Sequence, residues 1–275
     1  GTACKAPLPQ RKDIASMTIT AAHFAKVLKY GTMFKQGLEC TVLLSACTVL
    51  FGFIIAMLLA LMMLSNVYPL HFLAKTKCKS EKTQDLMIWL SKFNPLKFIA
   101  SVYVQFVRCT PMLVQIFLVY YIVFGVVTLP KFTFMGFIQF ERFLPGVVAL
   151  SLNSGGYLSD VIRGGIEGVD IGQTEAARSL GMSKRMTLFS IVMPQAIKNI
   201  LPAVANEFVT IIKESSVCYT VGVQDIMFNV RSVQSASFIT AEPLLVGTAL
   251  YFCLCFPTSQ IIQYIERRMR QSDKR

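Results

Sequence analysis

An uninterrupted apolar stretch constrains the fold of this chain more than any other feature of its sequence. Residues 40–74 contain no Asp, Glu, Lys or Arg. An α-helix needs about 20 apolar residues to cross the roughly 30 Å hydrocarbon layer of a bilayer. Hydrophobic residues make up 54% of the 275 residues and charged residues only 15%, which is too apolar for an ordinary soluble domain. We therefore expect an integral membrane protein whose first span covers about residues 37–64.

Four more stretches are expected to cross the membrane, which predicts an all-α domain of five transmembrane helices over residues 37–265. The second stretch contains Arg108, and Pro111 is expected to kink it because proline removes a backbone donor. The third is rich in Asn, Ser and Gly, and the fourth contains Asn206 and Glu207. The expected bounds of these four spans are about 98–127, 144–161, 197–212 and 243–265.

The distribution of basic residues predicts how the spans are oriented. The net charge is +12, and most Lys and Arg residues lie in segments 75–97, 163–198 and 267–275. The loops on the opposite side contain only Lys131, Arg142 and Arg231. Because cytoplasmic loops carry an excess of Lys and Arg, we expect the C-terminus in the cytoplasm and the N-terminus outside. This sorting also makes nucleic-acid binding an unnecessary explanation of the charge.

The two ends of the chain are expected to lie outside the membrane domain. Residues 1–36 are predicted to form an N-terminal extension, and residues 17–30 have the pattern of an amphipathic helix that lies on the bilayer. The six basic residues before Gly37 oppose the orientation given above. Residues 266–275 are predicted to form a basic cytoplasmic tail, and the basic stretch 71–94 has no function that the sequence indicates.

A short signature lies in the basic segment between the third and fourth spans. Strong helix formers are followed by Gly181, which can end a helix in the left-handed conformation. Ser183 is a good N-cap for a second helix. Two short helices that meet at a glycine form a compact knob, which is the shape of a docking element. The signature consists of Glu175, Ala176, Ala177 and Gly181, followed by Ile191, Met193 and Pro194.

Three further strings accompany this signature: FVRCTPMLVQ at residues 106–115, LSLNSGGY at 150–157 and KESS at 213–216. Together with the signature they resemble the permeases of the polar amino-acid ATP-binding-cassette importers, such as those for histidine, glutamine and arginine. The resemblance covers about residues 30–270. Cys109, Asp160 and Met193 depart from the Gly, Glu and Leu that are usual in this family.

The resemblance implies a type I importer permease core with a cytoplasmic coupling-helix loop, in the bacterial cytoplasmic (inner) membrane. It implies that a separate ATPase subunit docks on Glu175, Ala176, Ala177, Gly181, Ile191 and Pro194, and that this partner binds ATP and Mg. It also implies a second permease copy or a paralogue, an extracytoplasmic substrate-binding protein and an amino-acid substrate. Neither the identity of the amino acid nor the choice between homodimer and heterodimer follows from it.

The sequence itself offers no site for ATP hydrolysis or for a cofactor. No Gly-Lys dipeptide occurs, so the chain lacks a P-loop, and we expect it to be a transporter subunit rather than an enzyme. The glycine pairs at 155–156 and 164–165 are expected to allow close helix packing. The eight cysteines include no C-x-x-C pair, and we expect them to pack as small apolar residues rather than to bind metal.

Two ionisable residues, Arg108 and Asp160, need an explanation within the membrane domain. A guanidinium in hydrocarbon costs at least about 2.5 kcal/mol, so Arg108 must find a partner or face water. It either fixes the second span to a carboxylate or to carbonyls, or lies at the cytoplasmic interface. Asp160 can pair with Arg163, three residues further along one helix face. We assign Arg108, Pro111, Gln115 and Asp160 to a structural or gating role.

Carboxylates in the fourth span suggest a substrate path, because every amino acid carries an ammonium group. We expect Glu207 or Glu214 to line this path, although Glu214 can instead pair with Lys213. The hydrogen-bonding neighbours expected there are Asn153, Asn206, Ser215 and Ser216.

Two functions of other classes remain as alternatives. An intramembrane hydrolase would use Ser154 or Ser159 with His71, but His71 is expected at the cytoplasmic end of the first span and no serine motif is present. A membrane scaffold would show no dependence on an ATPase.

Overall fold

The computed structural model describes residues 20–65, 67–69 and 91–272. This part of the chain is almost entirely helical, as the apolar stretches predict. Its elements are α2 (Ala21–Leu28), α3 (Gly31–Leu64), α5 (Pro95–Cys109), α6 (Met112–Phe117), the π-helix η2 (Leu118–Val123), strands β1 (Thr133–Phe134) and β2 (Ile138–Gln139), α7 (Phe140–Glu167), α8 (Ile171–Ser179), α9 (Lys184–Thr187), the π-helix η3 (Leu188–Val192), α10 (Met193–Glu214), the 3-10 helix η4 (Ser215–Val221), α11 (Ile226–Ser237) and α12 (Ala241–Ser272).

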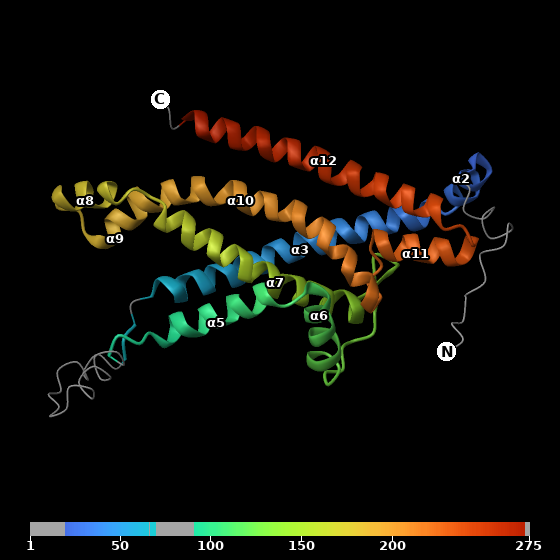
Figure 1. The fold of residues 1–275 in the computed structure, drawn as a ribbon, viewed down its shortest axis with the longest axis horizontal. Coiled ribbons are helices and arrows are strands. Elements are labelled where there is room, and N and C mark those ends of the chain that lie inside the picture. Colours follow the sequence, from blue (N-terminus) through green and yellow to red (C-terminus); the bar gives the residue numbers. More distant parts are fainter. Residues whose placement is uncertain (1–19, 66, 70–90, 273–275) are drawn as a thin grey trace, which may run out of the picture.

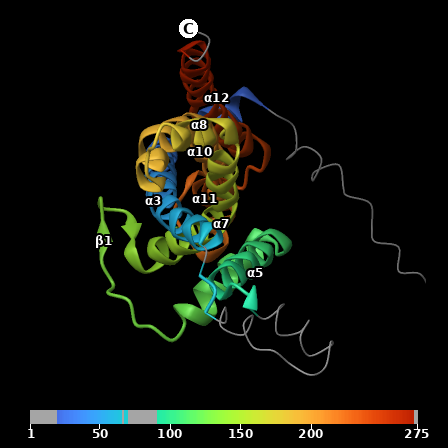
Figure 2. The ribbon, with the colours of Figure 1, turned by 90° about the vertical axis from the view of Figure 1, so that its left-hand side faces the viewer.

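The long helices run between two ends of the molecule, which we call the α8 end and the α11 end (Figure 1). Helices α3, α7 and α12 run toward the α8 end, whereas α5 and α10 run away from it. Seen from the α8 end, α3, α7 and α10 form one group, with α5 and α12 on opposite sides of it (Figure 2). This alternation of direction is what a chain that crosses a membrane repeatedly requires.

Within the described ranges, three continuous helical segments are long and apolar enough to cross a membrane: Gly31–Leu64, Lys184–Val221 and Ala241–Met269. A fourth crossing results if Pro95–Cys109 and Met112–Val123, which are bent by 112° at their junction, count as one span. Helix α7 has 28 residues, which is about 42 Å of helix, but its sequence is more polar. Helices α3, α7, α10 and α12 are longer than the apolar stretches that predicted them, because helices continue past the hydrocarbon layer into polar sequence.

The second expected span, 98–127, is wrong as a single kinked helix. Pro111 interrupts the chain where a kink was expected, but α5 ends at Cys109 and a separate helix starts at Met112. Thr110 and Pro111 are both in extended conformation, so the helical hydrogen bonds stop between the two segments. Beyond η2 the chain forms a short antiparallel hairpin in which Phe134 lies opposite Ile138.

Helix α3 packs along α7 through small residues. A Cβ atom on Gly155 would lie 2.6 Å from Cγ2 of Ile55, and one on Gly52 would lie 3.3 Å from the Ser154 hydroxyl. Backbones that approach so closely gain dispersion energy that lipid tails cannot supply to either helix. The glycine at 155 therefore has the packing role that the sequence predicts.

The α11 end is held by a buried polar cap. Asp225 begins α11 by accepting a hydrogen bond at 2.8 Å from the backbone N–H of Phe228, and its second carboxylate oxygen accepts one from the Tyr251 hydroxyl. Burial raises the pKa of Asp225 to about 7. Nearby, Val27 of the amphipathic segment α2 is fully buried in a cluster with Phe34 and residues of α11. Its apolar face thus packs on protein.

Substitution of Gly37 by alanine is expected to lower the melting temperature of the chain. A Cβ atom there would lie 2.9 Å from the Asp225 carbonyl oxygen and 3.0 Å from Cα of Ile226, and backbone cannot rotate away as a side chain can. Overpacking of this kind costs roughly 1–3 kcal/mol. Gly31→Ala is the matched control on the same helix, because no atom lies within 4 Å of its Cβ position. Equal melting temperatures in detergent for both variants would contradict this packing.

Candidate functional site

The signature segment folds as two short helices around a glycine, as its sequence predicts. Helix α8 begins where the Asp170 carboxylate accepts a hydrogen bond from the Gly172 backbone at 2.6 Å. It ends before Gly181, whose φ of +83° is the left-handed conformation that favours glycine. The Ser183 hydroxyl then accepts from the Met186 backbone and begins α9. The knob formed by α8 and α9 lies at one extremity of the molecule (Figure 1).

The outer surface of this knob carries large apolar side chains with no cover in the described part of the chain. Leu180 is 85% exposed, Ile171 73% and Phe189 68%. Large apolar side chains exposed on a polar segment mark a surface that another protein covers, although Phe189 belongs to the adjoining η3. Glu175 and Ala176 are exposed beside it. Ala177 instead is 5% exposed and faces the rest of the chain, so the two alanines do not share one docking face.

The second half of the signature lies in a different element from the first. Ile191 belongs to the π-helix η3, and Pro194 is the second residue of α10. Both lie inside the continuous helical segment Lys184–Val221 and not in a loop before the fourth span, which we expected to begin at about residue 197. The knob is thereby joined to the fourth span without an intervening loop.

The break after α5 is held by one side chain. The Gln115 amide nitrogen donates to the carbonyl oxygens of Val107 at 2.9 Å and Thr110 at 3.1 Å, and to the Thr110 hydroxyl oxygen at 2.8 Å. Its oxygen accepts from the Asn153 amide at 3.0 Å. Carbonyls that lose their helical partners at Pro111 are thus satisfied in the interior. Gln115 and Asn153 are both buried and form one unit that joins α6 to α7.

Arg108 pairs with a carboxylate, which is one of the two solutions that the sequence left open. Its guanidinium donates to Asp160 at 2.9 Å, and Arg163 donates to the other oxygen of the same carboxylate at 3.2 Å. Arg163 also donates to Glu167 at 3.1 Å. The predicted pair of Asp160 and Arg163 is therefore present within a larger network of ion pairs that joins α5 to α7.

One carboxylate of the fourth span meets a hydroxyl of the third. Ser154, which is buried in α7, donates to the Glu207 carboxylate of α10 at 2.9 Å. Glu207 itself is partly exposed, so its second oxygen is accessible to a ligand. Glu214 lies two helical turns further along α10 on about the same face. This arrangement offers negative charge and hydrogen-bond acceptors along one side of α10.

The other residues expected on the substrate path are not gathered around the Glu207 carboxylate. Asn206 is exposed and lines a cavity of about 380 Å³ between α10 and α12. Ser215, the first residue of η4, is fully buried and donates to the Ile212 carbonyl of α10, and Ser216 follows it. Asn153 is engaged by Gln115. Ser159, one of the two serines considered for a hydrolase, donates to the Gly156 carbonyl, and His71 lies outside the described residues.

Comparison with known proteins now gives the family. Residues 86–271 match the model of the binding-protein-dependent transport system inner membrane component. The chain belongs to this family. The permease is 38% identical over 184 residues to the arginine transport system permease protein ArtQ of Bacillus subtilis, covering 67% of the chain and 80% of that relative. It is 33% identical over 234 residues to the putative glutamine transport system permease protein GlnP of Rickettsia conorii, covering 85% and 91%.

Solved structures support the same fold for the permease. The crystal structure of an amino acid ABC transporter with histidines superposes with a TM-score of 0.72 at 35% identity, over 92% of this chain and 100% of that one. The methionine ABC transporter MetNI in an inward-facing conformation gives 0.58 at 13% identity, which indicates a shared fold. The permease therefore has the type I importer fold that the sequence predicts.

Sequence reasoning missed two parts of the permease site. Ser154 was considered only as a nucleophile, although a serine in an Asn- and Gly-rich span facing a membrane carboxylate is an ordinary hydrogen-bond donor. The exposed apolar side chains of the knob were also missed, although Leu180 and Phe189 are conspicuous apolar residues in a charged segment. In the described part of the permease, no group of three His, Cys, Asp or Glu residues is placed to hold a metal ion.

Proposed function

We propose that this chain is the membrane subunit of an ATP-driven amino-acid importer and couples to a separate ATPase through the α8–α9 knob. The observation that carries this proposal is the exposure of Ile171, Leu180 and Phe189 in and beside the knob, which a partner must cover in water. ATP and Mg bind to that partner, and this chain contributes no catalytic group. Glu175 and Ala176 are exposed in α8 and complete the contact.

The continuous helix behind the knob explains how a movement of the ATPase reaches the substrate path. Ala177 packs inward, and α8 contacts η3, which continues into α10. Helices bend little within a packed bundle, so a displacement of the knob moves α10 as a unit. Glu207 lies on this same helix and contacts Ser154 of α7. Closure of two ATPase subunits around ATP would shift α10 against α7 and open the path outward.

An amino-acid substrate fits the charge that the path presents. Relatives are named for arginine, glutamine and L-cystine, which share an α-ammonium and an α-carboxylate. The Glu207 carboxylate can pair with an ammonium group in a site of low dielectric, where such pairs are stronger than in water. Glu214 adds negative charge two turns away. We assign these two carboxylates to the substrate path and Asn206 and Ser216 to its margins.

The chain forms one half of the pathway and needs further partners. Helix α12 buries few of its residues against the rest of the chain, and the stacked pair Phe252 and Phe256 is largely exposed. We assign this surface to lipid and to a second copy or a paralogue, and an extracytoplasmic binding protein to the α11 end. The α8 end, with the knob and the C-terminal end of α12, is then cytoplasmic.

Reconstitution tests this function against the scaffold alternative. The chain is co-expressed with the ATPase and binding-protein subunits of its own transport system and placed in proteoliposomes. We expect uptake of a labelled amino acid that requires ATP, and copurification of the ATPase with the chain. A scaffold would be recovered without an ATPase and would produce no ATP-dependent uptake, so that result would refute the proposal.

A further inference from the structure

A small polar cavity lies at the α8 end, apart from the knob and from Glu207. It has a volume of about 230 Å³ and lies between the last turn of α3, almost the whole length of α5 and the second half of α7. Its polar lining consists of Lys97, Ser101, Gln105 and Arg108 from α5 and Asp160 and Arg163 from α7. The transport function proposed above uses none of the α5 residues.

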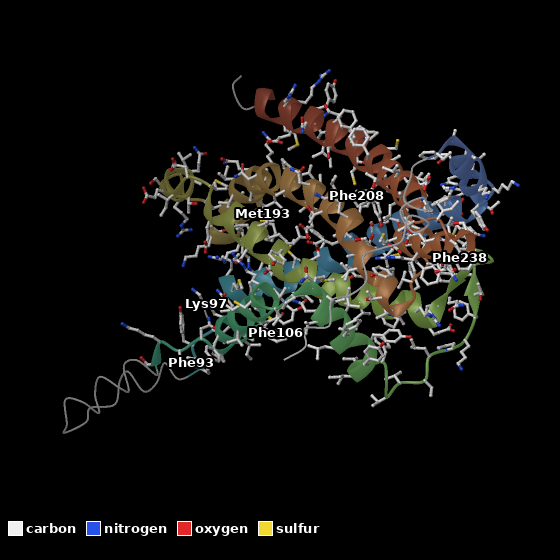
Figure 3. All side chains as sticks on the ribbon, turned by 45° about the vertical axis from the view of Figure 1, so that its right-hand side comes forward. Phe93, Lys97, Phe106, Met193, Phe208 and Phe238 are labelled. Carbon is white, nitrogen blue, oxygen red and sulfur yellow. The ribbon has the colours of Figure 1, made fainter. Side chains whose placement is uncertain are left out.

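The α5 residues of this lining form one stripe along the helix. Their spacing of four, four and three residues places them on a single face. The neighbouring face is apolar, and Phe98, Ile99, Val102 and Phe106 are each more than half exposed. Figure 3 shows Lys97 near the beginning of α5 and Phe106 further along the same helix. The surface of α5 thus has a polar stripe that lines the cavity and, beside it, an exposed apolar face that acyl chains can cover.

The lining has an excess of positive charge and of hydrogen-bond donors. The lining contains three cationic side chains but one carboxylate, that of Asp160, and both Arg108 and Arg163 pair with it. Glu167 lies outside the lining and accepts from Arg163. Even with this second carboxylate, the three cationic side chains have an excess of one positive charge. The Arg108 side chain is half exposed and has four further N–H donors besides the one that bonds to Asp160. Ser101 and Gln105 add neutral donors.

We propose that this cavity binds the phosphate group of an anionic phospholipid, whose acyl chains lie on the apolar face of α5. Arginine presents donors in a planar fork that suits phosphate, and lysine supplies a point charge at the edge of the cavity. Lys97 is in the first turn of α5, at the depth where head groups lie if this helix begins at the membrane surface. Each basic group at this depth raises the affinity for anionic lipid about fivefold.

Lipid binding to the purified full-length chain tests the site directly. The chain in neutral detergent is titrated with phosphatidylglycerol or phosphatidylcholine of identical acyl chains, and bound lipids are counted by native mass spectrometry. We expect tighter binding of phosphatidylglycerol, and about fivefold weaker binding of it by Lys97→Gln. Lys92→Gln is the matched control, because Lys92 is an exposed lysine near the same end that does not line the cavity. Its affinity is expected to stay within twofold of the wild type.

A third arm distinguishes a lipid head group from free phosphate. Inorganic phosphate at millimolar concentration is added at constant ionic strength, with chloride as the reference anion. If phosphate displaces the lipid from the wild type but not from Lys97→Gln, the phosphate site is retained and its ligand is the soluble ion. Equal losses in Lys97→Gln and Lys92→Gln, or equal binding of the two lipids by the wild type, would overturn the proposal. These binding results do not depend on transport, so they stand apart from the test of the proposed function.

Discussion

Replacement of Gly181 by valine is expected to lower ATP-dependent uptake about tenfold or more, while the chain still folds and inserts. Gly181 has a φ of +83°, and a residue other than glycine held there costs roughly 1–3 kcal/mol. Each 1.4 kcal/mol reduces the population of the docking geometry about tenfold. No atom lies within 4 Å of the Cβ position, so the effect comes from backbone conformation and not from a clash. Uptake and recovery of the ATPase should fall together.

Gly136→Val is the matched control for this variant. Gly136 also has a positive φ, of 79°, and also has no atom within 4 Å of its Cβ position, but it lies in the hairpin after η2. The same backbone strain is therefore introduced far from the knob. We expect this control to transport normally in proteoliposomes. Normal uptake by Gly181→Val, or an equal loss in both variants, would show that the knob does not couple the ATPase to the path.

Replacement of Glu207 by glutamine is expected to lower amino-acid uptake about 10- to 100-fold. Glutamine retains the oxygen that accepts from Ser154 at 2.9 Å, but it removes the negative charge. A hydrogen bond to a charged group contributes about 1.5–3 kcal/mol, which corresponds to this loss if the substrate ammonium binds here. Ser154→Ala is expected to have a smaller effect because it leaves the charge in place.

Two further variants show whether the charge acts locally. Glu214→Gln removes a carboxylate from the same side of α10, and we expect an intermediate loss of uptake. Glu39→Gln removes one from a half-exposed pair with Lys35 and should leave uptake unchanged. Uptake is measured with labelled amino acid under ATP, with the amount of assembled complex as reference. Wild-type uptake by both Glu207→Gln and Glu214→Gln would exclude a carboxylate on the substrate path.

Local chemistry could be predicted from the sequence where neighbouring residues determine the conformation. The turn at Gly181 and the cap at Ser183 depend on a few adjacent residues, and both are present. A kink at Pro111 was predicted for the same reason, but the chain breaks there into two helices. The 112° bend was not, because its stabilising contact is between Gln115 and Asn153, which are separated by 38 positions in the chain.

Partners across helices were harder to predict than the helices themselves. The need of Arg108 for a partner was evident from its place in a span, but the identity of Asp160, 52 positions away, required the packing of α5 on α7. The residues expected on the substrate path do not lie together in the structure, for a similar reason. The rotation of each helix about its axis decides which side chains face a path. Ser215 is therefore buried and bonded to the Ile212 carbonyl, while Glu207 accepts from Ser154. One sequence contains no measure of that rotation.

The break after α5 also sets how this chain fits the thickness of its membrane. Helix α5 has 15 residues, which is about 23 Å, so it cannot cross a hydrocarbon layer of roughly 30 Å by itself. The following segment leaves at a steep angle and exposes Tyr121, Ile122 and Val126. Apolar side chains of this segment can contact lipid along the plane of the membrane, whereas a straight span would continue across it. The bilayer around this side of the protein is consequently expected to be thinner than around α3, which gives the subunit a wedge-shaped boundary with its lipids.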